Sequence, residues 1–154
     1  MPTKAKQSKK PERLYWDSCV FLSYVEREAR RLPDIEALLG RANNGDVEIV
    51  TSVATITEVA YAATERQQRA LDLAVEQEID KLWTPPSPIR LVEFHQLIAM
   101  EARSLVRFAM ERTLQLKPYD AIHLSTAKYM RADRLETYDD KLQTFTGWAG
   151  CSGW

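Results

Sequence analysis

The chain has 154 residues, a length that fits one domain with one hydrophobic core. Hydrophobic residues make up 45% and charged residues 28%, as in ordinary soluble proteins, and no apolar run approaches the roughly 20 residues of a membrane span. The formal net charge of −1 argues mildly against a nucleic-acid-binding protein. It does not exclude one, because a bound metal ion reverses the local sign of charge in an acidic pocket.

Both ends of the chain differ in composition from its middle. Residues 1–12 are basic and polar, and we expect a flexible tail there, before a domain at residues 13–147. No apolar segment follows the basic residues, so we do not expect a secretory signal. Cys19 and Cys151 are too few and too distant for a disulfide framework or a zinc site, so a reducing, cytoplasmic location is the default. Residues 148–154 are predicted to form a C-terminal tail.

Strand and helix patterns alternate along the chain. In order, we expect a strand over residues 13–16, helices over 20–31 and 34–39, a strand over 47–51, a helix opened by Ser52 or Thr55, a helix over 65–83, a strand over 89–94, helices over 97–116 and 118–130, a strand over 134–138 and a short helix over 140–145. Ser18 is a candidate cap for the first helix. Such alternation implies right-handed crossovers and an α/β fold with a mainly parallel sheet.

Two acidic residues follow predicted strands directly. Asp17 ends the apolar run Leu-Tyr-Trp, and Asp139 follows the last predicted strand. Ligands of open parallel sheets bind at the carboxyl ends of the strands, and a charge next to a buried run is costly unless it is paired or metal-bound. For either residue alone, a purely structural role as a helix cap or turn residue stays open.

Two further acidic residues lie on predicted helices. Glu58 has small, mostly apolar neighbours, although an exposed helix glutamate is the ordinary alternative. Asp120 lies in the first turn of the helix that begins at Pro118, where the helix dipole favours an acid without any further role. Apolar residues follow Asp120 at helical spacing, which indicates buried surroundings.

Together these residues predict one acidic pocket on one side of the sheet. Four unpaired carboxylates in one place would repel each other strongly, and divalent metal ions resolve that repulsion. Ligand sets made only of oxygen suit Mg²⁺ or Mn²⁺. Such ions lower the pKa of a bound water and stabilise an in-line phosphoryl displacement. The residues alone therefore favour a metal pocket for phosphodiester hydrolysis.

Four segments, in this order, resemble the PIN-domain nucleases. Residues 14–22 resemble their opening strand with Asp and Ser, and residues 51–59 resemble the element in which a Ser precedes a helix bearing the Glu. Residues 118–127 resemble the Asp-Ala element, and Thr137-x-Asp139-x-x-Leu142 resembles the fourth. The resemblance spans about residues 14–145, and the ordered set is more specific than any one motif.

This resemblance implies a PIN-like three-layer α/β/α sandwich, with about four to five strands, and a metal-dependent nuclease. Carried over by position, the ligands of one or two Mg²⁺ or Mn²⁺ ions would be Asp17, Glu58, Asp120 and Asp139. Thr137 would hold a metal-bound water or a neighbouring carboxylate, and Ser18 and Asp140 are candidates for supporting contacts. The chain looks most like a VapC-type toxin, which would cut RNA, form a homodimer and be silenced by a cognate antitoxin.

Several other residues have ordinary structural interpretations. Two basic runs have a solvated helix face as their ordinary interpretation, and either is a candidate contact to RNA phosphates; they are Arg27, Arg30 and Arg31, and Arg103, Arg107 and Arg112. His95 and His123 are not needed for the predicted chemistry. We expect His123, between Ile122 and Leu124, to be a packed or partly exposed helix residue.

Three other functions compete with the nuclease. A receiver domain needs a phosphorylated Asp that ends a central strand and a later Lys after a strand, and the long helical stretch after Glu58 does not fit it. A haloacid dehalogenase-type phosphatase needs a second Asp two positions after the first, and Cys19 stands there. The strongest rival is a PIN-fold module that binds RNA or a partner without cutting. Four intact carboxylates argue against it, because a scaffold has no need of four mutually repelling charges.

Overall fold

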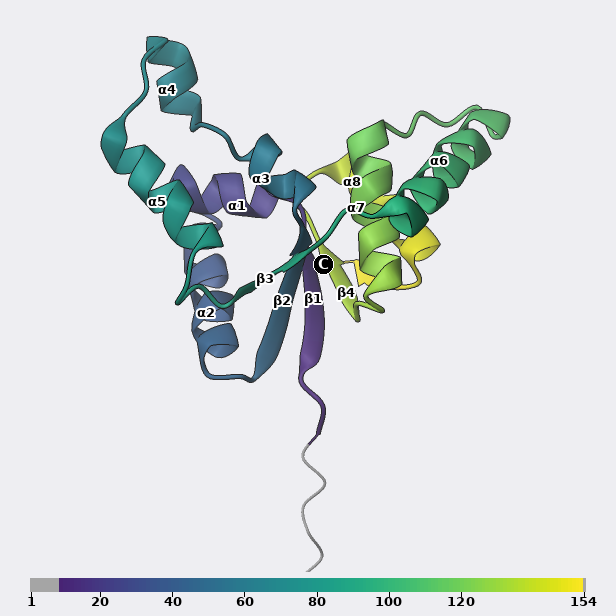
Figure 1. The fold of residues 1–154 in the computed structure, drawn as a ribbon, viewed down its shortest axis with the longest axis horizontal. Coiled ribbons are helices and arrows are strands. Elements are labelled where there is room, and N and C mark those ends of the chain that lie inside the picture. The colour runs from purple at the N-terminus through teal and green to yellow at the C-terminus, as the bar shows by residue number, and fades with distance from the viewer. Residues whose placement is uncertain (1–8, 154) are drawn as a thin grey trace, which may run out of the picture.

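A computed structural model describes residues 9–153, and its centre is a five-stranded, all-parallel sheet (Figure 1). The strand order is β3-β2-β1-β4-β5. The strands are β1 (Glu12–Trp16), β2 (Val47–Ser52), β3 (Ile89–Val92), β4 (Arg134–Glu136) and β5 (Ser152–Gly153). Among the described residues the predicted α/β class and parallel sheet are confirmed. No described helix is long and apolar enough to cross a membrane.

Side chains of the central strands alternate between the two faces of the sheet. Tyr15 and Val50 belong to the core on one face, whereas Leu14, Trp16 and Ile49 belong to the core on the other. All five side chains are at most 1% exposed. Strands buried on both faces need helices on both sides, so the sequence of β1 and β2 itself requires three layers.

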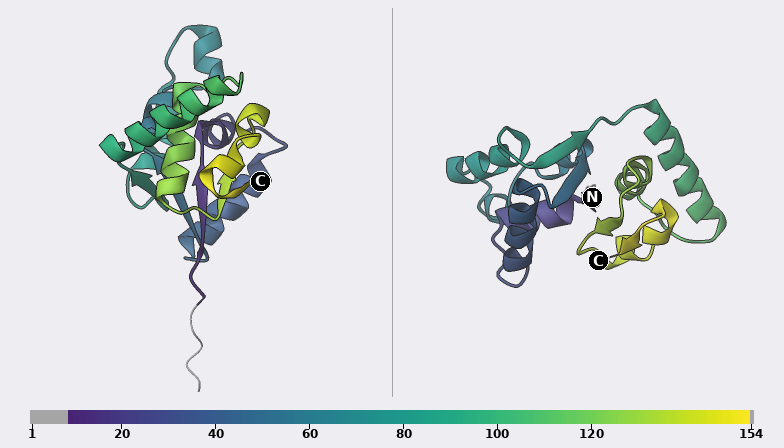
Figure 2. Two further views of the ribbon diagram at one scale, coloured as in Figure 1. Left: turned by 90° about the vertical axis from the view of Figure 1, so that its right-hand side faces the viewer. Right: turned by 90° about the horizontal axis from the view of Figure 1, so that it is seen from below.

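The helices form those two outer layers. One layer contains α1 (Ser18–Val25), α2 (Leu32–Asn43) and α5 (Leu73–Trp83), and the other contains α6 (Gln96–Glu111), α7 (Pro118–Tyr129) and α8 (Asp140–Gln143). The short helices α3 (Ala54–Glu58) and α4 (Ala63–Gln68) connect β2 to α5. Figures 1 and 2 show the two helical groups on opposite sides of the sheet. The predicted three-layer sandwich is confirmed.

The first helix is shorter than predicted and is capped by a different residue. Helix α1 ends at Val25 instead of residue 31, because Arg27 adopts a left-handed conformation with φ of 54°. The N-cap is Asp17, whose side chain accepts a hydrogen bond from the Cys19 amide, and Ser18 is already the first helical residue. The prediction of Ser18 as the cap was therefore wrong.

The predicted single helix over residues 65–83 is two helices, so that prediction was also wrong. Arg69 is left-handed, with φ of 53°, and Asp72 caps α5 through the Ala74 amide. The buried carboxylate of Glu65 accepts hydrogen bonds from the Ala62 and Asp72 amides, at 3.0 and 2.8 Å, and fixes the corner. Such side-chain hydrogen bonds compete with helix continuation, and they leave no mark on the apolar periodicity.

The C-terminal segment continues the sheet beyond the last predicted strand. Strand β4 stops at Glu136, two residues earlier than expected, because Thr137 turns its hydroxyl toward Asp17. A 3-10 helix, η1 (Thr146–Ala149), leads to β5, which pairs in parallel with β4. Within the segment predicted as a tail, residues 152–153 therefore form a strand. Residues 1–8 of the predicted N-terminal tail, and residue 154, lie outside the described part of the chain.

Candidate functional site

Four chain segments bring the predicted acidic residues to one edge of the sheet. Asp17 follows β1, and Asp139 is the N-cap residue of α8, three residues beyond the end of β4. Glu58 is the last residue of α3, which follows β2, and Asp120 lies in the first turn of α7. Because β1, β2 and β4 are parallel, their carboxyl ends meet at the edge that is uppermost in Figure 1.

Asp17 is the most buried of the four, with 3% of its surface exposed. Its Oδ1 accepts the Cys19 amide hydrogen bond at 3.1 Å, and its Oδ2 accepts one from the Thr137 hydroxyl at 2.5 Å. Burial raises the pKa of Asp17 from 3.8 to about 6, against the opposing effects of His123, Thr137 and the Cys19 amide. Keeping this carboxylate ionised therefore costs free energy.

Thr137 also ties Asp139 to the same edge. Its hydroxyl oxygen accepts a hydrogen bond from the Asp139 amide at 3.0 Å, and the same hydroxyl donates a hydrogen bond to Asp17. Asp139 Oδ1 in turn accepts from the Lys141 amide at 2.9 Å and caps α8. The side chain of Thr137, which is fully buried, thus sets the spacing between the segments that carry Asp17 and Asp139.

Glu58 is placed by hydrogen bonds at the end of β2. Thr51 donates to the Trp16 carbonyl at 2.7 Å and lies 2.8 Å from the Thr55 hydroxyl, which fixes α3 against β1. Ser18 donates to Glu58 Oε2 at 3.2 Å. The other carboxylate oxygen, Oε1, lies 2.6 Å from Nε2 of His123. Both oxygens of this carboxylate therefore have a fixed direction.

His123 belongs to a buried chain of hydrogen bonds that the sequence analysis did not foresee. Its Nδ1 lies 2.7 Å from the Tyr15 hydroxyl, whose oxygen also accepts from the Ser52 amide at 3.3 Å. Burial raises the pKa of Tyr15 well above its ordinary value, so the phenol keeps its proton and can donate it to Nδ1. When Nδ1 accepts from Tyr15, the ring N–H is at Nε2 and donates to Glu58.

The sequence gives little indication that Tyr15 and His123 are hydrogen-bonded to each other. Tyr15 lies in an apolar strand and His123 in an apolar helix, 108 positions apart. The only sequence signal is that His123 follows Asp120 by three residues, which places the two on neighbouring positions of one helix. The expectation that His123 is packed agrees with its exposure of 1%. Its hydrogen bond to Glu58 gives it a position in the site as well.

Asp120 is half-buried. Burial raises its pKa, and the charge of Asp139 adds to the rise. Within residues 9–153, the Asp120 carboxylate and Asp139 Oδ2 have no hydrogen-bond partner. Carboxylate oxygens of this kind suit Mg²⁺ and Mn²⁺ by donor type. In the same part of the chain, no three His, Cys, Asp or Glu side chains converge closely enough to form a ready coordination shell.

The candidate supporting and RNA-contact residues have different surroundings. Asp140 is exposed beside Asp139, and Arg27 and Arg30 are exposed after α1. Arg31 is engaged by other groups, because it stacks on the Tyr138 ring at 4.1 Å and donates to Ser23 at 3.0 Å. Arg103 and Arg107, on α6, line a groove of about 380 Å³ with apolar residues of α6 and α7.

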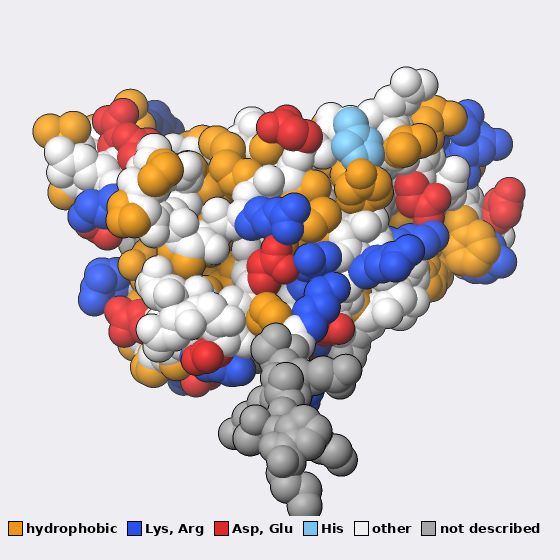
Figure 3. Space-filling view, turned by 60° about the horizontal axis from the view of Figure 1, so that its bottom comes forward, with side chains coloured by type: hydrophobic (Ala, Val, Ile, Leu, Met, Phe, Trp, Pro, Cys, Tyr) orange, Lys and Arg blue, Asp and Glu red, His pale blue; other side chains and the backbone are white. Residues whose placement is uncertain are grey.

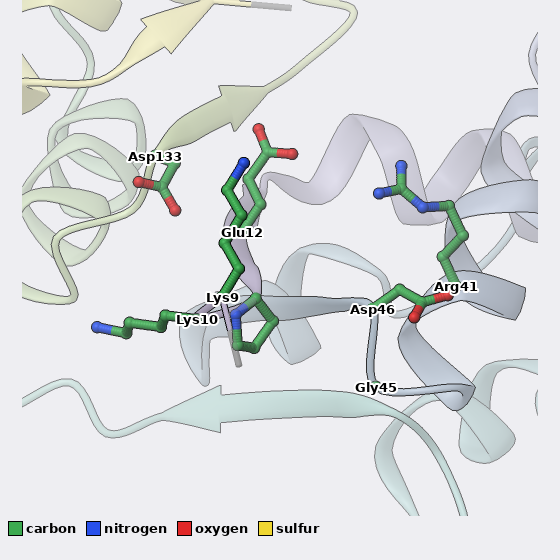
Figure 4. Close-up of a pocket in the computed structure, with 8 residues that line it drawn as sticks. Lys9, Lys10, Glu12, Arg41, Gly45, Asp46 and Asp133 are labelled. Carbon is green, nitrogen blue, oxygen red and sulfur yellow. The ribbon is translucent and has the colours of Figure 1, made fainter. Parts of the chain in front are cut away.

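A larger hollow, of about 580 Å³, lies at the opposite end of the sheet, where β1, β2 and β4 begin. Its charged lining residues are Lys9, Lys10, Glu12, Arg41, Asp46 and Asp133 (Figure 4). Cationic and acidic side chains are interspersed on this face (Figure 3). The hollow lies at the amino ends of the strands, away from the edge at which parallel sheets bind ligands.

The fold and the site define a class: an α/β/α sandwich with acidic residues at the carboxyl edge of a parallel sheet. The sequence model of the PIN domain matches residues 14–147, and the chain therefore belongs to the PIN domain family. Comparison with curated proteins gives no significant match.

Solved structures of similar fold include three from bacteria. One is the VapC20 toxin of Mycobacterium tuberculosis, described as cleaving the sarcin-ricin loop, with a TM-score of 0.63 and 12% identity over 85% of this chain and 93% of that chain. Another is VapBC2 of Rickettsia felis bound to a promoter DNA fragment, with a TM-score of 0.64 and 15% identity over 92% and 97%. FitAcB of Neisseria gonorrhoeae gives 0.64 and 13% over 92% and 96%. At these low sequence identities, the similarity to the three structures shows that this chain has the same fold.

The raised pKa of Asp17 predicts that this residue lowers stability near neutral pH. The folded state keeps the Asp17 proton up to about pH 6, whereas the unfolded chain releases it near 3.8, so ionisation disfavours folding as pH rises between these values. We expect Asp17→Asn to raise the unfolding free energy of metal-free protein by about 1–3 kcal/mol near pH 8, and by less near pH 5. Urea denaturation with EDTA at both pH values measures the change.

A matched control for Asp17→Asn is Asp34→Asn, which changes an exposed acid in the first turn of α2. Asp34 should show no such gain. If Asp17→Asn destabilises the protein equally at both pH values, the account of a costly buried charge is wrong.

The hydrogen bonds of Tyr15 predict an indirect effect on the divalent-ion site that the sequence leads us to expect at this edge. Tyr15→Phe keeps the packed ring but removes the hydroxyl that holds His123, so Glu58 loses its fixed direction. We expect Mn²⁺ affinity to fall by about 10- to 100-fold, with a loss of only about 1–2 kcal/mol in unfolding free energy. Isothermal titration calorimetry measures the affinity. An unchanged affinity, or an equal fall in the control Tyr24→Phe on α1, contradicts the role.

Proposed function

We propose that the protein is an Mg²⁺- or Mn²⁺-dependent endoribonuclease. The observation that carries this proposal is the gathering of Asp17, Glu58, Asp120 and Asp139 at the carboxyl edge of the sheet, with the Asp17 pKa raised to about 6. A scaffold gains nothing from burying such a carboxylate, because burial disfavours its ionised form. Membership of the PIN domain family supports a nuclease over other uses of an acidic pocket.

The side chains divide into those that would hold the metal and those that would orient the holders. Asp120 and Asp139 Oδ2 offer oxygens that no hydrogen bond occupies within the described residues, and Asp17 and Glu58 complete the ligand set. Thr137 would orient Asp17, while Ser18 and His123 would orient Glu58. When bound, the ion would neutralise charge on the phosphodiester and acidify a water molecule for in-line attack.

We further infer that the nuclease acts as the toxin of a toxin–antitoxin pair. This proposal is supported by the sequence resemblance to VapC-type toxins and by the fold that the chain shares with VapC20, VapBC2 and FitAcB. A cognate antitoxin and a homodimer belong to this proposal. The two free cysteines, Cys19 and Cys151, fit a reducing cytoplasm.

The direct test is RNA cleavage by the purified protein. We expect a mixed RNA pool to be cut with Mg²⁺ or Mn²⁺ and left intact with EDTA. Asp120→Asn should reduce the rate by at least about 100-fold, because it removes a ligand of the ion that stabilises the charge formed during the reaction. Gel analysis of end-labelled RNA measures the rate and the cut sites.

Asp34→Asn is the matched control, since Asp34 and Asp120 both lie in the first turn of a helix that begins with a proline at its first or second position. It should cut at the rate of the parent. No cutting by folded, metal-supplied parent protein would contradict the nuclease and favour a PIN-fold module that binds without catalysis. Equal cutting by Asp120→Asn would contradict the assignment of the site.

A further inference from the structure

A groove adjoins the acidic edge beside two of the four candidate carboxylates, Asp120 and Asp139. It lies between the segment before α7 and helix α8, and its volume is about 430 Å³. Asp120 and Asp139 form part of its wall, so a ligand in the groove contacts the candidate metal ligands directly. Pockets of roughly 300–1,000 Å³ hold ligands of small-molecule size, which includes a single nucleotide.

Two lysines line the groove next to these acids. Lys117 and Lys141 are exposed, and neither makes an ion pair within 4.0 Å of a carboxylate in the described part of the chain. The exposed lysines Lys81 and Lys128 differ, because they pair with Glu78 and Glu101. Lys117 is close enough to lower the pKa of Asp120 against the larger effect of burial. The ammonium groups of Lys117 and Lys141 are therefore available to an anion at the edge.

Besides Asp120 and Asp139, the groove has one further acidic residue, Asp140, and its remaining lining residues are suited to the uncharged parts of a nucleotide. Leu114 is 46% exposed, Phe145 also lines the groove although it is mostly buried, and Thr144 adds a hydroxyl. An acidic site repels an RNA backbone unless cations lie beside it. Lys117 and Lys141 are the cations that a phosphate would meet among the acids of this groove, and Leu114 and Phe145 offer apolar contact to the base or ribose.

We propose that this groove binds one nucleotide of single-stranded RNA next to the phosphate that is cut, with Lys117 and Lys141 as its phosphate contacts. The identity of the ligand as RNA rests on the proposed function. One unstacked nucleotide fits the volume, whereas a base pair within a duplex is stacked on both sides and cannot enter. In this proposal the phosphate next to the cut is contacted by the two lysines, and the arginine groups do not line the groove.

The arginine candidates lie elsewhere. Arg103 and Arg107 line a separate groove that contains neither Asp120 nor Asp139. Arg31 is held by Tyr138 and Ser23. Lys117 and Lys141, in contrast, line the same groove as Asp120 and Asp139.

The test measures RNA binding without cleavage. In a Glu58→Gln background, which lies outside the groove, a short fluorescein-labelled single-stranded RNA is titrated and its anisotropy followed at several salt concentrations. The double change Lys117→Gln with Lys141→Gln should weaken binding by about tenfold or more near 0.1 M salt. It should also reduce the slope of log K against log salt by about 2, one for each lost phosphate contact.

Two further variants separate a site from a net-charge effect. Lys81→Gln with Lys128→Gln removes the same charge outside the groove and should leave the slope nearly unchanged. Lys117→Arg with Lys141→Arg keeps the charge and should retain most of the affinity, while circular dichroism confirms folding of each variant. The inference is overturned if the groove variant binds like its background, if the control pair loses as much, or if the background does not bind RNA.

The outcome is independent of catalysis. If RNA binding depends on the two lysines but the parent protein does not cut RNA, the groove proposal is supported and the nuclease proposal is contradicted. If the parent cuts RNA but binding does not change when both lysines are replaced, only the groove proposal is contradicted.

Discussion

The buried carboxylate of Asp17 is the constraint on which the rest of the site depends. It lies at the carboxyl end of the central strand, between cores on both faces of the sheet, where desolvation raises its pKa to about 6. An ionised group in such a place requires hydrogen-bond donors or a cation. The Cys19 amide and the Thr137 hydroxyl supply the donors. Asp17 also caps α1, so one side chain serves both the helix and the site.

Parallel topology gathers the remaining groups around Asp17. Strands β2 and β4 flank β1, so the segments that follow them must meet where β1 ends. The side chains there are fixed in two connected sets: Thr137 joins Asp17 to Asp139, and His123 with Ser18 orients Glu58. Tyr15 supports the second set from inside the core. Hydrogen-bonded support of this kind keeps functional carboxylates in place when their mutual repulsion would separate them.

The sequence predicts much of this arrangement because strand ends and helix starts carry local signals. Asp17 and Asp120 lie at such positions. In a parallel sheet the segments that follow neighbouring strands lie close together, so residues distant in the sequence become neighbours. The hydrogen bond between Tyr15 and His123 is invisible in the sequence, because it depends on how α7 packs against β1. The break near Arg69 is equally hidden, since the buried hydrogen bonds of Glu65 do not alter apolar spacing. Strand β5 has only two residues, too few for a pattern.

The central claim is that these four carboxylates form one divalent-cation site. Crystals of the protein grown with Mn²⁺ and measured near the manganese absorption edge test it most directly, because anomalous scattering locates the ion independently of the protein coordinates. We expect a peak enclosed by Asp17, Glu58, Asp120 and Asp139, with metal–oxygen distances of about 2.0–2.3 Å, and no peak there for Asp120→Asn. A well-ordered site without a peak, or a peak unaffected by that substitution, would contradict the account.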